Sequence, residues 1–138
     1  MIELPGLLDT NVFIHAHTHD NVSKECRDFL AALEVGSVRA VLEPVILNEL
    51  SYALPHYFKQ ISREEIAEYL LMILSWEGVL GPKETLIDTI ERWRRTPRLS
   101  FVDAYLAARA GQESRSIYSK NVRELRAQGV LVPNTLPR

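Results

Sequence analysis

Short apolar runs alternate with segments of helical periodicity along most of the chain. Each apolar run is the length of a strand, and these runs lie at 6–9, 38–42, 78–80, 116–119 and 130–132. The helical segments between and after them lie at about 22–33, 44–54, 62–76, 83–95, 101–110 and 121–127. Alternation of this kind favours a parallel sheet with helices on both faces. The sequence therefore predicts a three-layer α/β/α sandwich with a central parallel sheet.

Helix boundaries are marked by capping residues and prolines. Pro44 suits the first position of a helix, and we expect that helix to end before Pro55. Asn21 or Ser23 is the expected N-cap of the first long helix, and 62–65 reads as a capping box. The run 69–74 is apolar all the way round its helix, which predicts cover on more than one side, by the core and by a second chain. A helix lying wholly inside one domain is the alternative.

The composition is that of an ordinary globular protein, with 138 residues, 46% of them hydrophobic and 25% charged. This length predicts a single domain spanning 1–138. Cys26 is the only cysteine, which is typical of a reducing, cytoplasmic setting, and the sequence predicts neither a signal peptide nor a membrane span. The net charge is −2, so any contact with nucleic acid must depend on a local basic patch.

Three carboxylates stand at positions that are hard to explain structurally. Asp9 ends the first apolar run, and Glu49 shares a helical stripe with Ile46 and Ala53. Asp103 precedes an apolar stripe of its own helix. A carboxylate turned toward a core costs several kcal/mol unless it is paired or binds a metal, so a shared cation explains all three together. A capping box with Ser100 is the alternative for Asp103, and an ion pair with an arginine is the alternative for Glu49.

The motifs around these acids resemble those of the PIN domain, in the order and spacing of small VapC-type toxins. The resemblance rests on segments 8–12, 47–50, 99–108 and 117–121, and it covers nearly the whole chain. It implies that Asp9, Glu49 and Asp103 hold Mg²⁺ or Mn²⁺ in a ribonuclease. It also implies that Thr10, Asn11 and Ser119 support the site. Asn121 stands where the family has a fourth acid, so we expect weaker binding of a second cation.

The resemblance implies a divalent-metal-dependent endoribonuclease of PIN-like fold, the toxin of a type II toxin–antitoxin pair. Its partners would be RNA, a cognate antitoxin protein and a second copy of the chain. Two alternatives remain open at this point. One is a PIN-fold protein that binds RNA or a partner with little or no catalysis, and the other is a phosphatase-like or DNA-acting metal hydrolase that uses the same acids.

Two further clusters have chemistry of interest. Arg92, Arg94 and Arg95 lie just ahead of Asp103 beside a tryptophan, and arginine suits phosphate contact. A solvated helix end is the other interpretation of these arginines. His15, His17 and His19 occupy alternate positions, and imidazole is a common zinc ligand, so a zinc site is one interpretation. Histidines in a solvated loop are the interpretation that we favour.

Overall fold

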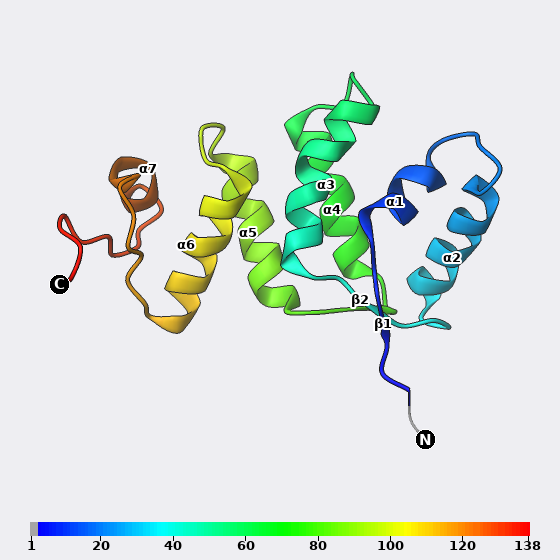
Figure 1. Ribbon diagram of the computed structural model, residues 1–138, viewed down its shortest axis with the longest axis horizontal. Helices are drawn as coiled ribbons and strands as arrows, with labels where there is room; N and C mark the ends of the chain where they lie inside the picture. Colours follow the sequence, from blue (N-terminus) through cyan, green and yellow to red (C-terminus); the bar gives the residue numbers. More distant parts are fainter. Residues whose placement is uncertain (1–2) are drawn as a thin grey trace. The chain divides into compact units, whose positions relative to one another are not determined.

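The computed structural model describes residues 3–138. The chain packs as two compact units, of which unit 1 ends at Lys83 and unit 2 comprises Glu84–Arg138. Figure 1 labels the helices and strands of both units. The sequence predicts that both units belong to one domain spanning 1–138. This stays a prediction.

The sheet lies in unit 1 and consists of three short parallel strands. These are β1 (Gly6–Leu7), β2 (Ala40–Val41) and β3 (Val79–Leu80), in the order β1-β2-β3. The backbone N–H of Leu8 donates to the Val41 carbonyl at 2.9 Å, which extends the pairing beyond β1 toward Asp9. The predicted α/β class with a central parallel sheet is confirmed, and the first three expected strands are present in shorter form.

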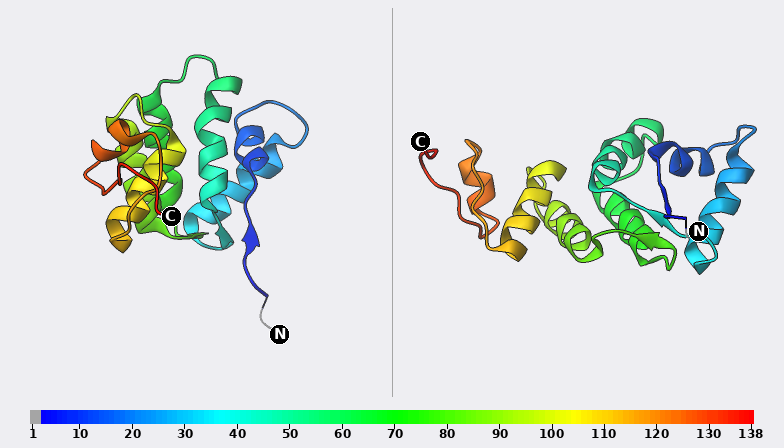
Figure 2. Two further views of the ribbon diagram at one scale, coloured as in Figure 1. Left: turned by 60° about the vertical axis from the view of Figure 1, so that its left-hand side comes forward. Right: turned by 60° about the horizontal axis from the view of Figure 1, so that its bottom comes forward.

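Four helices connect these strands, namely α1 (Thr10–Ala16), α2 (Ser23–Val35), α3 (Pro44–Tyr57) and α4 (Arg63–Ser75). Helix α1 packs against α2 and α3, and α3 lies beside α4 (Figures 1 and 2). Their inward faces form a core of fully buried side chains that includes Phe13, Leu33, Leu47, Leu50 and Leu70. Burial of such apolar faces is the main force that holds short strands and helices of this kind together.

The boundary of α4 agrees with the sequence, and those of α2 and α3 differ in part. The Ser62 hydroxyl accepts the Glu65 N–H while the Glu65 carboxylate accepts the Ser62 N–H, so the capping box is confirmed. Helix α3 begins at Pro44 as expected, but it continues past Pro55 to Tyr57. The prediction of an end before Pro55 was wrong because proline removes only its own N–H, and the Phe58 N–H closes the last turn on Leu54.

The start of α2 corrects a second prediction. Its N-cap is Val22, which has no capping side chain, rather than Asn21 or Ser23. The carboxylate of Asp20 accepts the Val22 N–H at 3.0 Å and the Ser23 hydroxyl at 3.2 Å. The acceptor that stabilises the start of α2 is therefore Asp20, the residue immediately before the predicted Asn21.

Helix α4 has one apolar side chain, Met72, that the core leaves exposed. Leu70, Ile73 and Leu74 are buried, whereas Met72 is 45% exposed. The expectation that a second chain also covers this helix stays a prediction. No helix within residues 3–138 is long and apolar enough to cross a membrane.

Gly78 precedes β3 at a point where two backbones approach closely. Its N–H donates to the Leu33 carbonyl at 2.8 Å and its carbonyl accepts the Ala40 N–H at 2.9 Å. A Cβ atom at this position would collide with the carbonyl oxygen of Val38 and lie 2.6 Å from that of Leu33. Only glycine fits between these backbone atoms without a shift.

Unit 2 contains α6 (Phe101–Glu113), α7 (Val122–Arg126) and all of α5 (Lys83–Arg95) except its first residue, close to the expected ranges. The rings of Trp93 on α5 and Phe101 on α6 meet edge to face with centroids 5.7 Å apart. A second cluster of buried side chains joins α6 and α7 to the segments beside them, and its members are Ala110, Ile117, Leu125 and Val132.

The two C-terminal strands predicted at 116–119 and 130–132 are not formed in the described residues. The segments do meet, because the Ile117 N–H donates to the Leu131 carbonyl at 2.9 Å. The neighbouring Val132 carbonyl, however, accepts two hydrogen bonds from the guanidinium of Arg126, at 3.1 and 2.7 Å. A side chain thus takes the acceptor that a strand ladder would use, while Ile117 and Val132 still satisfy the apolar pattern by packing in the core.

Candidate metal centre

Asp9 stands at the junction between the sheet and α1. It has an extended backbone at the N-cap position of α1, yet its side chain makes no capping hydrogen bond. The residue is exposed, and within residues 3–138 no hydrogen bond or ion pair engages its carboxylate. Capping therefore does not explain this acid, and its oxygens are available to a ligand.

Glu49 lies at the border of the apolar face of α3. It is half-buried, as are Ile46 and Ala53 on the same stripe. In the described part of the chain its carboxylate has no ion pair with an arginine, so the structure gives the ion-pair interpretation no support. A half-buried carboxylate without a protein partner is energetically unfavourable unless something else neutralises it.

Glu49 shares a hollow with the start of α1. The hollow has a volume of about 300 Å³, and α1 contributes Thr10, Asn11 and Ile14 to its lining. Thr10 is only 2% exposed, and its hydroxyl has no hydrogen-bond partner among the described residues. A buried polar group in this state is rare in proteins, because leaving it unpaired costs free energy.

The α3 side of the hollow adds residues that the sequence analysis did not single out. Besides Glu49 and Ala53, these are Tyr52, His56 and Tyr57. Their spacing of three, seven and eight residues from Glu49 places them on its helical stripe, so the same periodicity that singled out Glu49 was available to find them.

Asp103 is held by a different set of contacts in unit 2. The Ser100 hydroxyl accepts the Asp103 N–H at 3.0 Å, so Ser100 does cap α6. The carboxylate of Asp103 instead accepts a hydrogen bond from the Asn121 side-chain amide at 2.7 Å. The Ser119 hydroxyl accepts the Asn121 N–H at 2.9 Å and so fixes the turn that carries the amide.

The predicted site residues are therefore divided between the two units. Unit 1 contains Asp9, Thr10, Asn11 and Glu49, and unit 2 contains Asp103, Ser119 and Asn121. Among the described residues, neither unit by itself gathers three histidine, cysteine, aspartate or glutamate side chains that could hold a metal ion.

Comparison with known protein families shows which family this chain belongs to. A family model described as a PIN domain matches residues 6–114, well over half of the chain. The chain belongs to the PIN domain family. PIN domains are generally nucleases, and they typically use divalent metals. Neither the curated proteins nor the solved structures provide a match.

Most of the proposed site lies inside the PIN domain match. Asp9, Glu49 and Asp103 all fall within residues 6–114, whereas Ser119 and Asn121 lie beyond them. The position at which this chain departs from the expected four-acid pattern is therefore outside the matched region.

The arginines ahead of Asp103 in this PIN domain differ in their surroundings. Arg92 donates to the Asp88 carboxylate and to the Gln128 carbonyl, each at 2.9 Å, and its side chain is only 18% exposed. Arg94 donates to the Glu91 carboxylate at 3.0 Å. Arg95 is exposed. Arg92 therefore stabilises unit 2, and Arg95 is the member of the trio that is most accessible to a phosphate.

Two histidines of the PIN domain, His15 and His17, have separate partners. His15 Nδ1 lies 2.7 Å from an Asp20 carboxylate oxygen, and His17 Nε2 lies 2.8 Å from the Tyr69 hydroxyl. Hydrogen bonds from Thr18 and then His15 lower the pKa of Asp20. In unit 1, as described, these side chains do not gather into a zinc site.

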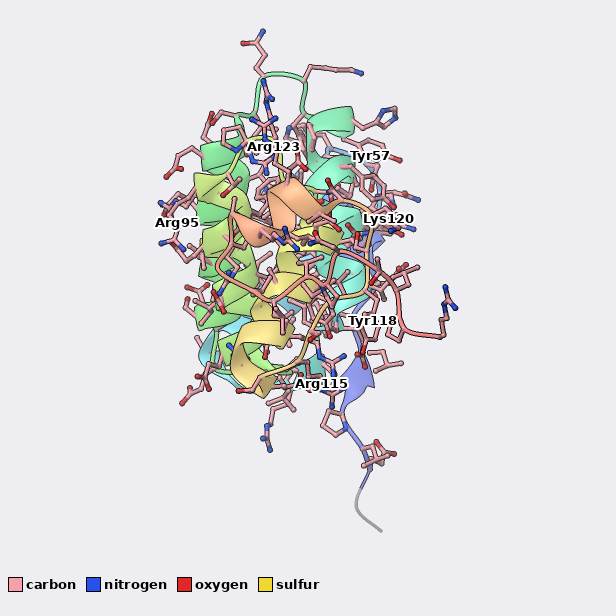
Figure 3. The ribbon with its side chains drawn as sticks, turned by 90° about the vertical axis from the view of Figure 1, so that its left-hand side faces the viewer. Tyr57, Arg95, Arg115, Tyr118, Lys120 and Arg123 are labelled. Atoms are coloured by element: carbon pink, nitrogen blue, oxygen red, sulfur yellow. The ribbon has the colours of Figure 1, made fainter. Side chains whose placement is uncertain are left out.

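Charge is distributed unequally between the two units of the PIN domain protein. Unit 1 has six lysines and arginines against twelve aspartates and glutamates, a net charge of −6, whereas unit 2 has ten against six, a net charge of +4. Figure 3 faces unit 2 and labels exposed side chains there, namely Arg95, Arg115, Tyr118, Lys120 and Arg123. Unit 2 is therefore basic, although the net charge of the whole chain is −2.

Proposed function

We propose that this PIN-domain protein is a divalent-metal-dependent endoribonuclease and the toxin of a type II toxin–antitoxin pair. The observation that supports the proposal most strongly is how the three acidic side chains are partnered within the protein. Asp9 and Glu49 present carboxylates without protein partners, and Asn121 holds the carboxylate of Asp103 in one orientation.

The donor set suits a hard cation. Carboxylate oxygens select Mg²⁺ or Mn²⁺ over softer metals, and the three acids offer only oxygen ligands. Thr10 lines the same hollow as Glu49, and its buried hydroxyl has no hydrogen-bond partner among the described residues. In this proposal Asp9, Glu49 and Asp103 hold the cation, and Thr10 and Asn11 support them.

A bound divalent cation supplies Lewis acidity, lowering the pKa of a water and stabilising charge on the phosphodiester oxygens. The chain's own residues then have distinct tasks. The carboxylates of Asp9 and Glu49 would provide negative charge for the cation, and Asn121 orients Asp103 through its amide. Ser119 positions Asn121 through its backbone N–H.

The basic surface of unit 2 supports RNA as the substrate. Its net charge is +4, and Tyr118, which is 63% exposed, lies between Arg115 and Lys120 in the sequence. Cationic side chains attract the phosphate backbone, and an exposed aromatic ring stacks on an unpaired base. Arg95 is the arginine ahead of Asp103 that best fits such a contact.

Purified full-length protein incubated with RNA, with and without Mn²⁺, tests this proposal. We expect cleavage that requires Mn²⁺ and falls by roughly 100-fold or more in Asp9→Asn, because one metal ligand is lost. Asp28→Asn is the matched control, since it removes an exposed carboxylate from α2 outside the site. Cleavage that persists in EDTA, or that is equal in Asp9→Asn and wild type, would contradict the metal mechanism.

The second candidate function is an RNA-binding or partner-binding PIN domain without catalysis. Asn121 favours it, because an amide at this position replaces one negative charge of the expected acidic cluster. RNA binding without any Mn²⁺-dependent cleavage in the same experiment would select this alternative.

The toxin role adds partners to the proposal, a cognate antitoxin and a second copy of the chain. The exposed Met72, in the apolar run 69–74 of α4, supports an apolar contact with one of them. Growth arrest on expression, relieved by a small DNA-binding protein encoded just upstream, is the expected result. Growth unaffected by expression of an active nuclease would contradict the toxin role alone.

A further inference from the structure

The hollow beside Glu49 has an aromatic wall. Tyr52, Ala53, His56 and Tyr57 lie three, four, seven and eight residues after Glu49, which aligns them with it along one stripe of α3. Tyr52 is 59% exposed and Tyr57 is 57% exposed, and Tyr57 is labelled in Figure 3. The rings of His56 and Tyr57 meet edge to face with centroids 5.1 Å apart.

The opposite wall, on α1, offers a polar group that lacks a partner. Thr10 lines the hollow although it is only 2% exposed, and its buried hydroxyl has no hydrogen bond to any described residue. Asn11 adds a side-chain amide, and Ile14 adds an apolar surface. A buried hydroxyl that is unpaired within the protein is explained when a ligand or water completes its hydrogen bond.

The chemistry of the lining selects the class of ligand. The described residues around the hollow include neither lysine nor arginine, and Glu49 contributes a negative charge. A phosphate group would therefore be repelled unless a cation lay between, whereas a flat uncharged ring can contact the tyrosines and the apolar side chains. The volume of about 300 Å³ is at the lower end of the roughly 300–1,000 Å³ typical of small-ligand sites, so it suits one ring system.

We propose that this hollow binds one nucleobase of a single-stranded RNA substrate, next to the cation site at Glu49. Tyr52 and Tyr57 contact the face of the base, and Thr10 and Asn11 hydrogen-bond to its edge. The proposal rests on the ribonuclease function proposed above. It further proposes that residues of α1 and α3 determine which base the ribonuclease prefers in its RNA substrate.

Affinity for a short single-stranded RNA, measured by fluorescence anisotropy in EDTA, tests the base site without cleavage. We expect Tyr52→Ala and Tyr57→Ala each to weaken binding about tenfold, because stacking on a base is lost. Tyr52→Phe keeps the ring and should bind as wild type does. Val35→Ala is the control for loss of an exposed apolar side chain of unit 1 outside the hollow.

An abasic nucleotide moved along the same RNA locates the bound base. In the wild type we expect one position at which the missing base weakens binding, and in Tyr52→Ala we expect that penalty to disappear. A penalty that is unchanged in Tyr52→Ala, or tyrosine variants that bind RNA as tightly as the wild type, would overturn the base site. Tyrosine variants that lose only a protein partner would overturn it as well.

The two proposals can fail separately. Cleavage that needs Mn²⁺ and Asp9 while both tyrosine variants bind RNA normally would leave the ribonuclease intact and remove the base site. Tyrosine-dependent base binding by a protein that never cleaves RNA would support the hollow and remove the nuclease. Both tyrosines are more than half exposed, so their removal leaves the core unchanged, and circular dichroism of each variant verifies this.

Discussion

Asn121 occupies the position of an expected acid and makes a contact that an acid could not make. Its amide donates a 2.7 Å hydrogen bond to the Asp103 carboxylate, and its own N–H is held by Ser119. A carboxylate in its place would have no proton to donate and would face Asp103 with like charge. The substitution therefore exchanges a potential second-cation ligand for a residue that positions Asp103.

Asn121→Asp should raise Mn²⁺ affinity and Mn²⁺-dependent cleavage by roughly tenfold, since two facing carboxylates are stabilised by a shared cation. Without metal, the same repulsion should lower the melting temperature of the variant. Calorimetric titration with Mn²⁺ and an RNA cleavage assay measure the first effect, and thermal unfolding in EDTA measures the second.

Asn121→Ala is the control, because it removes the hydrogen bond to Asp103 without adding charge. It should reduce cleavage and leave Mn²⁺ affinity no higher than that of the wild type. If Asn121→Asp changed neither Mn²⁺ affinity nor cleavage, position 121 would not belong to the site.

Single positions were predictable from the sequence where local periodicity decides them. The half-buried setting of Glu49 follows from its stripe on α3, and Asp9 follows the first strand as its apolar run indicates. Tyr52 and Tyr57 obey the same periodicity, so the sequence contained that signal too. The unpaired hydroxyl of Thr10 was not predictable, because it depends on how α1 packs against α3.

Among the elements, capping residues were more informative than strand-forming runs. The capping box at Ser62 fixed the start of α4, since its two hydrogen bonds are local. The runs at 116–119 and 130–132 have the composition of strands, but a strand also needs a neighbour that accepts its hydrogen bonds. In unit 2 the guanidinium of Arg126 takes one of those acceptors, which no local pattern reveals.

The approach of the backbones at Gly78 gives a prediction for unit 1. Gly78→Ala should reduce the free energy of unfolding by roughly 1–3 kcal/mol, because the added methyl group collides with carbonyl oxygens between α2 and β3. Urea unfolding measures the change. Gly6→Ala is the matched control, since its Cβ would meet nothing within 4 Å, and it should alter the free energy by less than about 0.5 kcal/mol. Equal effects from the two substitutions would show that the close approach is absent.

The contact between the end of α1 and α4 should depend on pH through His17. Partial desolvation and then the charge of Arg27 hold the pKa of His17 below its usual value of 6.5, and its Nε2 lies within hydrogen-bond distance of the Tyr69 hydroxyl. As pH falls below 6.5, the unfolded chain binds a proton that the folded His17 resists. The native state therefore loses stability from 6.5 down to the lowered folded pKa.

Thermal unfolding between pH 7.5 and pH 5 measures this dependence. His17→Gln should flatten the fall in melting temperature over that range because it removes the titrating group. His19→Gln, which changes an exposed histidine of the following loop, should keep the slope of the wild type. A slope that is identical in His17→Gln and the wild type would exclude His17 as its source.

For the whole molecule, the division of charge is more informative than the total. The net charge of −2 gives no indication of nucleic-acid binding, whereas unit 2 alone has a net charge of +4. The acids of the proposed centre are divided in the same way, with Asp9 and Glu49 in unit 1 and Asp103 in unit 2. The central proposal is that these three carboxylates, which are far apart in the sequence, hold one cation.

Calorimetric titration of the full chain with Mn²⁺ tests that proposal most directly. We compare the wild type with Asp9→Asn and Asp103→Asn, which remove one carboxylate from each unit, and with Asp28→Asn as the control. The proposal predicts that both site variants lose about tenfold or more in Mn²⁺ affinity while the control binds as the wild type does. Mn²⁺ binding in Asp103→Asn as tight as in the wild type would contradict it.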